Sequence, residues 1–329
     1  MQLFAISLRR VFAAASVVLA SAACATPSPE FECIAGAQPG GGFDRTCKLL
    51  RTAFADDPSL NRHFRIRHMP GGIGAVAWHT VTSQRRAEPN TLVAFSTGSV
   101  LNIVLGRFGK GTVNDVRWIA TVGADHGAVA VRADAPYADL PSLLAHLKAK
   151  PSSVIFGGGG RLGSQDWMKS ALVARAAGVP HKAMRYVAFE GGGESLTALI
   201  SGHIHVYAGD ASEIAPFVKS GEVRLLTVLA AARLPGVLSN VPTPRELGVS
   251  IEEWTTVRGV YAGPDVPPAD VERLTRIFER ISRSESFVKA RDDLGMTPFN
   301  LRGEALTTYV KKDAQRLKKL ASDFGLGSP

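Results

Sequence analysis

The feature that most limits how this chain can fold is a repeated pattern: an apolar, strand-like run ends in a glycine cluster, and a helix-like segment follows. The clusters lie in PGGGFDRT from Pro39, MPGGIGAVAW from Met69, FGGGGRLGSQDW from Phe156 and FEGGGESLTAL from Phe189. Glycine loses much conformational entropy on folding, so such runs indicate positions where a side chain would obstruct. Strands that alternate with helices predict an α/β fold of mainly parallel sheets flanked by helices.

The position of the glycine clusters predicts a binding site. In open α/β sheets the ligand lies beyond the carboxyl ends of the strands, which is where these loops are. A loop without side chains leaves backbone N–H groups and the positive end of the helix dipole free to face a ligand. One helix N-terminus contributes about 0.3–1 kcal/mol toward an anion, and up to about 2 kcal/mol when partly buried. Any single cluster can also be a plain strand-to-helix turn, but several together favour an anion site.

The chain has 329 residues, enough for two domains. Two strand-like segments, HGAVAVRADA from His126 and EEWTTVRGVYAG from Glu252, resemble crossings between domains. We predict a signal peptide at 1–25, the first part of domain 1 at 26–128, an inserted domain 2 at 129–250, and the return of domain 1 at 251–329. Two α/β lobes joined by two strands form a hinged clamp around a ligand.

The first 25 residues have the composition of an export signal. MQLFAISLRR is a basic n-region, VFAAASVVLA is a short apolar run, and Ala23–Ala25 is a small-residue cleavage site. The apolar run falls short of the roughly 20 residues that span a bilayer. We therefore predict a cleaved signal peptide and an exported protein. Lipid attachment at Cys24 is the alternative, which Ser21 disfavours because lipoprotein signals usually have Leu there.

Cys33 and Cys47 are the cysteines that remain after the signal. In an exported chain they most simply form a disulfide, which would stabilise the fold by about 3 kcal/mol in the chain-entropy model. A buried pair of free thiols is the alternative. No cysteine spacing resembles a zinc site, and we predict no metal.

Charge and motifs exclude several classes of function. The net charge is +9, and removing Arg9 and Arg10 with the signal leaves +7. The basic residues are scattered rather than clustered with aromatic residues, which favours small anions over nucleic acid. GGGRLG from Gly158 matches the dinucleotide pattern but lacks the later acidic residue, and no phosphate loop is present, so no cofactor is predicted. Ser164 lacks the following glycine of a hydrolase elbow and is predicted to be a helix N-cap.

Arg161 is the charged residue that stands out. It lies within a glycine loop at a helix start, and its forked guanidinium suits a carboxylate, although a solvated loop arginine is the alternative. Ser96 and Thr97 offer neutral hydrogen-bond donors at another strand end. Asp44 is predicted in a first helical turn, where the helix dipole favours an acid, and Asp210 is predicted to be an N-cap.

Motifs along the mature chain resemble one known family. CIAGAQPGGGFDRTCKLL, MPGGIGAVAW, GSQDWMKSAL and MRYVAFEGGGESLTALISG are similar, in order, to the extracytoplasmic solute-binding proteins of tripartite tricarboxylate transporters, the Bug-type receptors, and most of all to the tricarboxylate-binding receptor among them. The resemblance implies a monomeric, two-lobed periplasmic binding protein of type II-like architecture, without catalysis. It would capture a carboxylate in the cleft between its lobes, citrate being the leading candidate, and deliver it to one large and one small membrane subunit.

The resemblance also implies which residues bind the ligand. The first glycine loop would hold a carboxylate, and loops of the second lobe would supply further contacts. With the donors named above, the predicted ligand-binding residues are Gly40, Gly41, Gly42, Phe43, Asp44, Ser96, Thr97, Gly159, Arg161, Gly163, Ser164, Gln165, Glu190, Gly191, Gly192, Gly193 and Asp210. Because an acid near the first loop meets the ligand ammonium in amino-acid-binding relatives, Asp44 leaves an amino acid as an alternative ligand. An exported hydrolase or phosphate-handling enzyme that uses the same loops is the alternative from another class.

Overall fold

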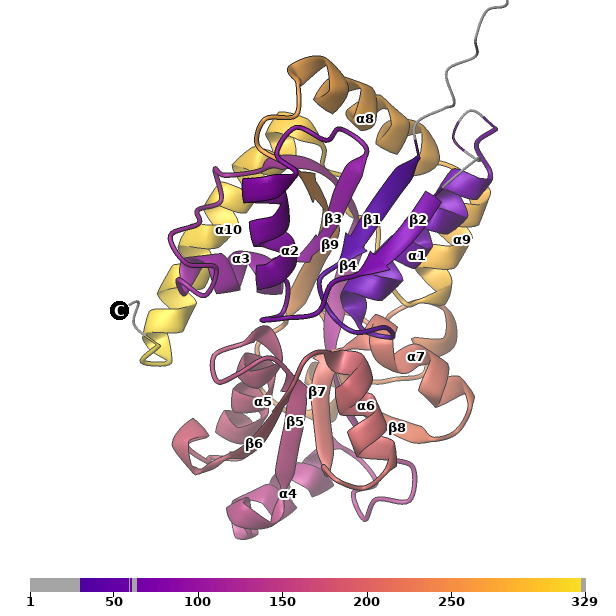
Figure 1. Ribbon diagram of the computed structural model, residues 1–329. Coiled ribbons are helices and arrows are strands. Elements are labelled where there is room, and N and C mark those ends of the chain that lie inside the picture. Colours follow the sequence, from indigo (N-terminus) through magenta and orange to yellow (C-terminus); the bar gives the residue numbers. More distant parts are fainter. Residues whose placement is uncertain (1–29, 59, 61–63, 327–329) are drawn as a thin grey trace, which may run out of the picture.

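The computed structural model describes residues 30–58, 60 and 64–326 (Figure 1). The predicted signal peptide and Cys24 lie outside the described residues. The strands are β1 (Phe31–Ala35), β2 (Phe64–His68), β3 (Thr91–Ser96), β4 (Arg117–Arg132), β5 (Ile155–Gly159), β6 (Arg185–Phe189), β7 (Val206–Asp210), β8 (Val223–Leu229) and β9 (Thr255–Ala262).

The α-helices are α1 (Gly42–Ala55), α2 (Ala75–His79), α3 (Thr97–Val104), α4 (Leu140–Ala149), α5 (Gln165–Ala176), α6 (Gly192–Ile200), α7 (Ala211–Lys219), α8 (Pro268–Ile281), α9 (Glu285–Asp293) and α10 (Gly303–Asp323). Shorter helical turns are η1 (Thr80–Gln84), η2 (Pro151–Ser153), η3 (His181–Ala183), η4 (Gly236–Leu238) and η5 (Arg245–Leu247). Of the helices within the described residues, none combines the length and the apolar character that a membrane span requires.

The long strand β4 connects two groups of strands. Its first part pairs with β9, from Arg117 opposite Ala262 to His126 opposite Thr255, and its second part pairs with β7 and β8. The strand order is β2-β1-β3-β9-β4-β7-β5-β6, with β8 also on β4. We call the part with β1–β3, β9, α1–α3 and α8–α10 the first lobe, and the part with β5–β8 and α4–α7 the second lobe (Figure 1). The predicted boundaries, at 128/129 and 250/251, stay predictions.

The strands that lead into glycine loops are parallel, as their strand–loop–helix pattern predicts. β1 pairs parallel with β2 and β3, and β5 pairs parallel with β6 and β7. β4 and β9 are antiparallel to each other and carry the chain between the lobes, and β8 pairs antiparallel with the second part of β4 inside the second lobe. The α/β fold is therefore confirmed, with sheets of mixed direction.

The disulfide between Cys33 and Cys47 is present, with an S–S distance of 2.00 Å, which confirms the predicted pairing. It joins the centre of β1 to α1, and neither cysteine is exposed to solvent. Leu50 and Phe54, one and two turns further along α1, are equally buried and pack in the same apolar cluster. The bridge and this cluster fix the start of α1 at the end of β1.

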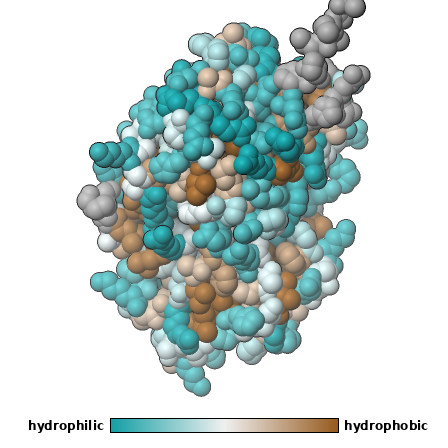
Figure 2. Space-filling model, in the orientation of Figure 1, coloured by the Kyte–Doolittle hydropathy of each residue, from teal (hydrophilic) through white to brown (hydrophobic). Residues whose placement is uncertain are grey.

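A second apolar cluster runs through both lobes. It includes Trp118 of β4, Trp167 of α5 and Phe324, which follows α10. The rings of Trp167 and Phe324 are 5.8 Å apart, so the end of α10 packs against the second lobe. The face drawn in Figure 2 is mainly hydrophilic with separate apolar patches. The fold thus places the two lobes in contact beside the connecting strands.

Candidate ligand-binding site between the lobes

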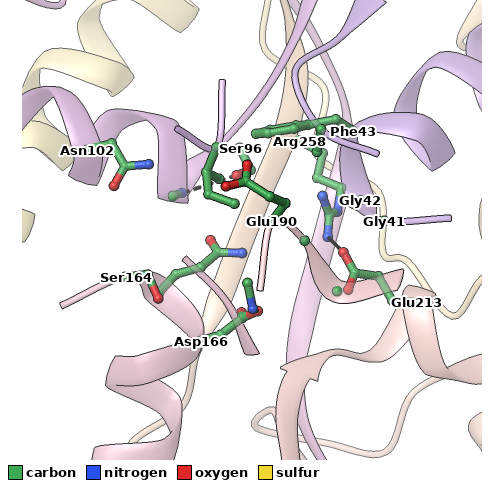
Figure 3. Close-up of a pocket in the computed structure, with 17 residues that line it drawn as sticks. Gly41, Gly42, Phe43, Ser96, Asn102, Ser164, Asp166, Glu190, Glu213 and Arg258 are labelled. Atoms are coloured by element: carbon green, nitrogen blue, oxygen red, sulfur yellow. Dashed lines mark hydrogen bonds and ion pairs between the residues drawn. The ribbon is translucent and has the colours of Figure 1, made fainter. Parts of the chain in front are cut away.

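A pocket lies between the lobes at the point where several helices begin (Figure 3). Residues from the first turns or N-caps of α1, α3, α5, α6 and α7 line it, and its free volume is about 50 Å³. We call it the inner pocket. The predicted residues that line it are Gly41, Gly42, Phe43, Ser96, Gly159, Ser164, Gln165, Glu190, Gly191 and Gly192. The sequence patterns did not predict its other lining residues, Ala37, Ile73, Gly98, Asn102, Asp166, Glu213 and Arg258.

Two glycine loops from opposite lobes meet at this pocket. A Cβ atom added to Gly193 would lie 2.9 Å from the carbonyl oxygen of Pro39, closer than real Cβ contacts allow. A Cβ atom on Gly41 would lie 3.6 Å from the backbone nitrogen of Gly192, so the first turns of α1 and α6 face each other. No side chain caps the N-terminus of either helix. The glycines therefore let two uncapped helix N-termini approach one small volume.

The helices α3 and α5 are capped by serines. The hydroxyl oxygen of Ser96 accepts the N–H of Gly98 at 3.2 Å, and that of Ser164 accepts the N–H of Trp167 at 3.2 Å. The N-cap predicted for Ser164 is thus confirmed. Thr97 faces away from the pocket, because its hydroxyl accepts the N–H of Val257 on β9 at 3.0 Å.

Asp44 holds the first glycine loop from the side away from the pocket. Its Oδ2 accepts the N–H of Gly40 at 2.9 Å and contacts Nζ of Lys48 at 2.7 Å, while its Oδ1 lies 2.8 Å from Nε2 of His68. Burial alone would raise the pKa of Asp44, but the bonds from Lys48, Gly40 and His68 lower it overall. Asp44 is therefore an ionised support for the loop and does not line the inner pocket.

A buried ion-pair network centred on Arg258 of β9 forms one side of the inner pocket. The Arg258 guanidinium contacts Asp125 at 2.8 Å, Asp210 at 2.6 Å and Glu213 at 3.5 Å, and 2% of its side chain is exposed. Figure 3 shows its contact with Glu213. Burial alone would lower the pKa of Arg258, but the three acids raise it. Three of the protein's own carboxylates thus already pair with the guanidinium, through its Nε and Nη2 atoms.

Lys169 of α5 extends the network. Its Nζ lies 2.6 Å from Asp210 and 2.8 Å from Asp166, and its side chain is fully buried. Asp210 occupies the N-cap position of α7, but its side chain makes no capping bond. The predicted N-cap position of Asp210 is therefore confirmed, but its side chain does not cap the helix, because its carboxylate pairs with Lys169 and Arg258 instead. Their charges lower the pKa of Asp210 although burial alone would raise it, whereas burial raises the pKa of Asp166.

Glu213 is the acid of the network whose pKa is raised close to neutral pH. Burial raises its pKa to about 7, against a smaller opposing effect of the Arg258 charge. The hydroxyl of Tyr207 also donates to it. Four acids, Asp125, Asp166, Asp210 and Glu213, surround the two bases Lys169 and Arg258. The network thus carries no surplus positive charge, and attraction for an anion has to come from the helix N-termini.

A larger chamber of about 400 Å³ adjoins the inner pocket and shares Ile73, Asn102 and Glu190 with it. We call it the outer chamber. Arg161 lines this chamber together with Arg107, and not the inner pocket. Within the described part of the chain, no group of His, Cys, Asp or Glu side chains could hold a metal ion. The predicted residues outside the inner pocket are Gly40, Asp44, Thr97, Arg161, Gly163, Gly193 and Asp210.

Two α/β lobes joined by β4 and β9, with a pocket at converging helix N-termini, define the class of two-lobed solute-binding proteins. The model of the tripartite tricarboxylate transporter family receptors matches residues 70–326. The chain belongs to this family, and the resemblance in its motifs is confirmed. It is a solute-binding receptor by family and by fold.

Three similar proteins each match about nine tenths of this chain. The UPF0065 protein in the tcbD-tcbE intergenic region of Pseudomonas sp. (strain P51) is 23% identical over 92% of this chain and 89% of its own length. MatC of Rhodopseudomonas palustris with bound malate has a TM-score of 0.76 and 21% identity, over 90% of this chain and 99% of its own. The R. palustris protein Rpa4515 with adipate has a TM-score of 0.79 and 21% identity, over 91% of this chain and 98% of its own. At this identity the two structures share the fold with this chain.

Proposed function

We propose that this chain is the periplasmic receptor of a tripartite tricarboxylate transport system. It binds citrate or a related di- or tricarboxylate between its lobes and delivers it to a membrane permease of one large and one small subunit. It acts as a monomer and performs no catalysis. Family membership supports the transport role, and the malate and adipate bound by two proteins of the same fold support a carboxylate ligand.

The observation that carries the proposal is the approach of α1 and α6 across the inner pocket. Both helices begin in glycine, lack side-chain caps and belong to different lobes. Helix N-termini of this kind attract carboxylates through N–H groups and the dipole. Because each lobe supplies one N-terminus, a carboxylate contacts both only when the lobes are closed. Ligand binding then favours the closed state through contacts that the open state lacks.

An amino acid is the second candidate ligand. The carboxylates of Asp166, Glu190 and Glu213 line the inner pocket beside the helix N-termini. An ammonium group next to a carboxylate would match this combination of acids and N–H donors. An amino acid would therefore use the same closing mechanism with a different balance of charges.

A thermal-shift screen of carboxylates and amino acids tests the proposal. A ligand that binds only the native state stabilises it and so raises the melting temperature. The stabilisation grows with the logarithm of the ratio of ligand concentration to Kd. We expect citrate or another di- or tricarboxylate to give the largest shift. A larger shift with an amino acid would replace the first candidate by the second, and no shift with any carboxylate or amino acid would contradict the proposed ligand class.

A further inference from the structure

The outer chamber contains two arginines from opposite lobes. Arg107 follows α3 in the first lobe, and Arg161 lies in the loop between β5 and α5 in the second lobe. Arg107 donates to Oδ1 of Asn102 at 3.1 Å and to the carbonyl oxygen of Leu162, which is next to Arg161. Burial, and then the charge of Arg161, lowers the pKa of Arg107. The two guanidiniums are thus close enough to repel each other.

No ion pair within the described residues joins either arginine to a carboxylate. Glu190 and Glu194 also line the chamber, but Glu194 accepts the backbone N–H of Glu190 at 3.1 Å and so faces its own loop. Two like charges in one chamber, neither in an ion pair with a carboxylate, favour an anion between them. This arrangement differs from the inner pocket, where three carboxylates form ion pairs with Arg258.

Ile73 lies where the two chambers adjoin, with Asn102 and Glu190. It lines both of them, and its Cγ1 would lie 3.5 Å from a Cβ atom on Gly160 of the other lobe. Its φ is +49°, a left-handed value that is rare for a β-branched residue. Backbone strain of this kind persists where the surrounding structure requires a particular side-chain position. A ligand that occupies both chambers has to pass this side chain.

The sizes of the chambers differ by a large factor. The inner pocket, about 50 Å³, is of the size of one small polar group, whereas the outer chamber, about 400 Å³, is within the range of whole ligand sites. We propose that the outer chamber is a second anion subsite, in which Arg107 and Arg161 bind the far anionic group of a ligand whose first carboxylate lies in the inner pocket. The inference rests on the proposed function, and it specifies an elongated ligand with anionic groups at both ends.

Calorimetric titration with succinate, adipate and hexanoate tests the second subsite. Adipate and hexanoate have the same carbon chain and differ in the far carboxylate. The wild type should bind adipate more tightly than hexanoate. Arg161→Gln should weaken adipate binding about 5- to 10-fold, as expected for a lost charge-assisted hydrogen bond, and leave hexanoate binding unchanged. Arg161 is exposed, and its one hydrogen bond within the described residues is made by its backbone carbonyl oxygen, which accepts the N–H of Ser164 at 2.8 Å, so this side-chain variant should fold normally.

Two further variants are compared with Arg161→Gln: one should strengthen adipate binding, and the other should leave it unchanged. Glu194→Gln removes a negative charge from the chamber while its amide oxygen can still accept the Glu190 N–H, so adipate should bind several-fold more tightly. Arg276→Gln, on the exposed face of α8, changes the net charge by the same amount as Arg161→Gln but should leave the affinity for both ligands unaffected. If the wild type binds hexanoate and adipate equally, or if Arg161→Gln weakens both alike, the second subsite is wrong while the carboxylate receptor stands. If none of the three ligands binds although another carboxylate raises the melting temperature, the second subsite is wrong and the carboxylate receptor stands; if no carboxylate binds in either test, the proposed function fails as well.

Discussion

Arg258 of β9 and Asp210 at the end of β7 form a buried ion pair of 2.6 Å that joins the two lobes at the base of the inner pocket. Oδ1 of Asp210 also accepts hydrogen bonds from Nζ of Lys169 at 2.6 Å and from the hydroxyl of Thr256 at 3.0 Å. The carboxylate is therefore held from both lobes, by α5 of the second and β9 of the first. This pair ties the shape of the pocket to the strands that connect the lobes.

Removal of Arg258 should destabilise the protein strongly. Arg258→Met leaves Asp125, Asp210 and Glu213 buried without their shared cation, and breaking a buried pair in this way costs about 3–5 kcal/mol. Urea denaturation followed by circular dichroism measures the change. Arg276→Met on the exposed surface is the control and should change stability by less than about 0.5 kcal/mol. A loss below about 1 kcal/mol for Arg258→Met would show that the network is not structural.

Glu213 should make stability fall as pH rises toward neutrality. Burial raises its pKa from the ordinary value of 4.5 to about 7, so between these pH values the folded state binds more protons than the unfolded state. Stability then decreases with rising pH across this window, by about 3 kcal/mol in total from this group. Denaturation curves between pH 4.5 and 8 measure the effect.

Glu213→Gln is the comparison for the pH effect. Its amide oxygen can take the place of the carboxylate oxygen that accepts from Arg258, and its NH2 group can donate to the Tyr207 hydroxyl, but the amide does not titrate. The difference in stability between variant and wild type should therefore grow in favour of the variant as pH rises from 4.5 to 7, and stay constant above. Parallel curves for the two proteins would mean that Glu213 titrates at an ordinary pKa.

Loss of the disulfide should lower stability without changing the pocket. Cys33 and Cys47 are 14 residues apart, and closing a loop of this length stabilises by about 3 kcal/mol in the chain-entropy model. The double variant Cys33→Ala/Cys47→Ala should show this loss in urea and keep its ligand affinity. A thiol assay on the denatured, unreduced protein should detect neither cysteine, and two reactive thiols would rule out the bridge in solution.

The strand–loop–helix pattern predicted much of the fold and the loop half of the site, because a glycine cluster between a strand and a helix has a local cause. Gly41, Gly192 and Ser164 could be assigned for this reason, and all three line the inner pocket. The roles of the loops could be predicted from short stretches of sequence. Their contact across the cleft depends on how the two lobes are placed.

Arg258 and Glu213 could not be predicted as site residues from their local sequence. Arg258 lies in the strand TTVRGVYA, where a single charged residue normally indicates a solvent-facing position, yet it is buried. Its partners Asp125 and Asp210 are 133 and 48 residues away in the chain. Arg161 was assigned to the right loop, but the direction of a long side chain on a glycine loop depends on tertiary contacts, and it lines the outer chamber.

The central claim is that a carboxylate binds where α1 and α6 face each other, and Gly41→Ala tests it most directly. A methyl group at this position meets only ordinary contacts, 3.6 and 3.7 Å from the backbone nitrogens of Gly192 and Gly193, and the φ of −84° suits alanine. The variant should therefore keep its stability but cover the N–H groups of the pocket. Gly178→Ala is the matched control, because Gly178 lies outside the pocket. Its φ of +72° is unfavourable for alanine, so the substitution should cost about 1 kcal/mol of stability without loss of ligand affinity.

The decisive measurement is isothermal titration of wild type, Gly41→Ala and Gly178→Ala with the carboxylate that gives the largest thermal shift. We predict one site per chain in the wild type, affinity at least 10-fold weaker in Gly41→Ala at an unchanged melting temperature of the free protein, and wild-type affinity in Gly178→Ala. Equal affinity in wild type and Gly41→Ala would contradict the claim that the facing helix N-termini bind the ligand.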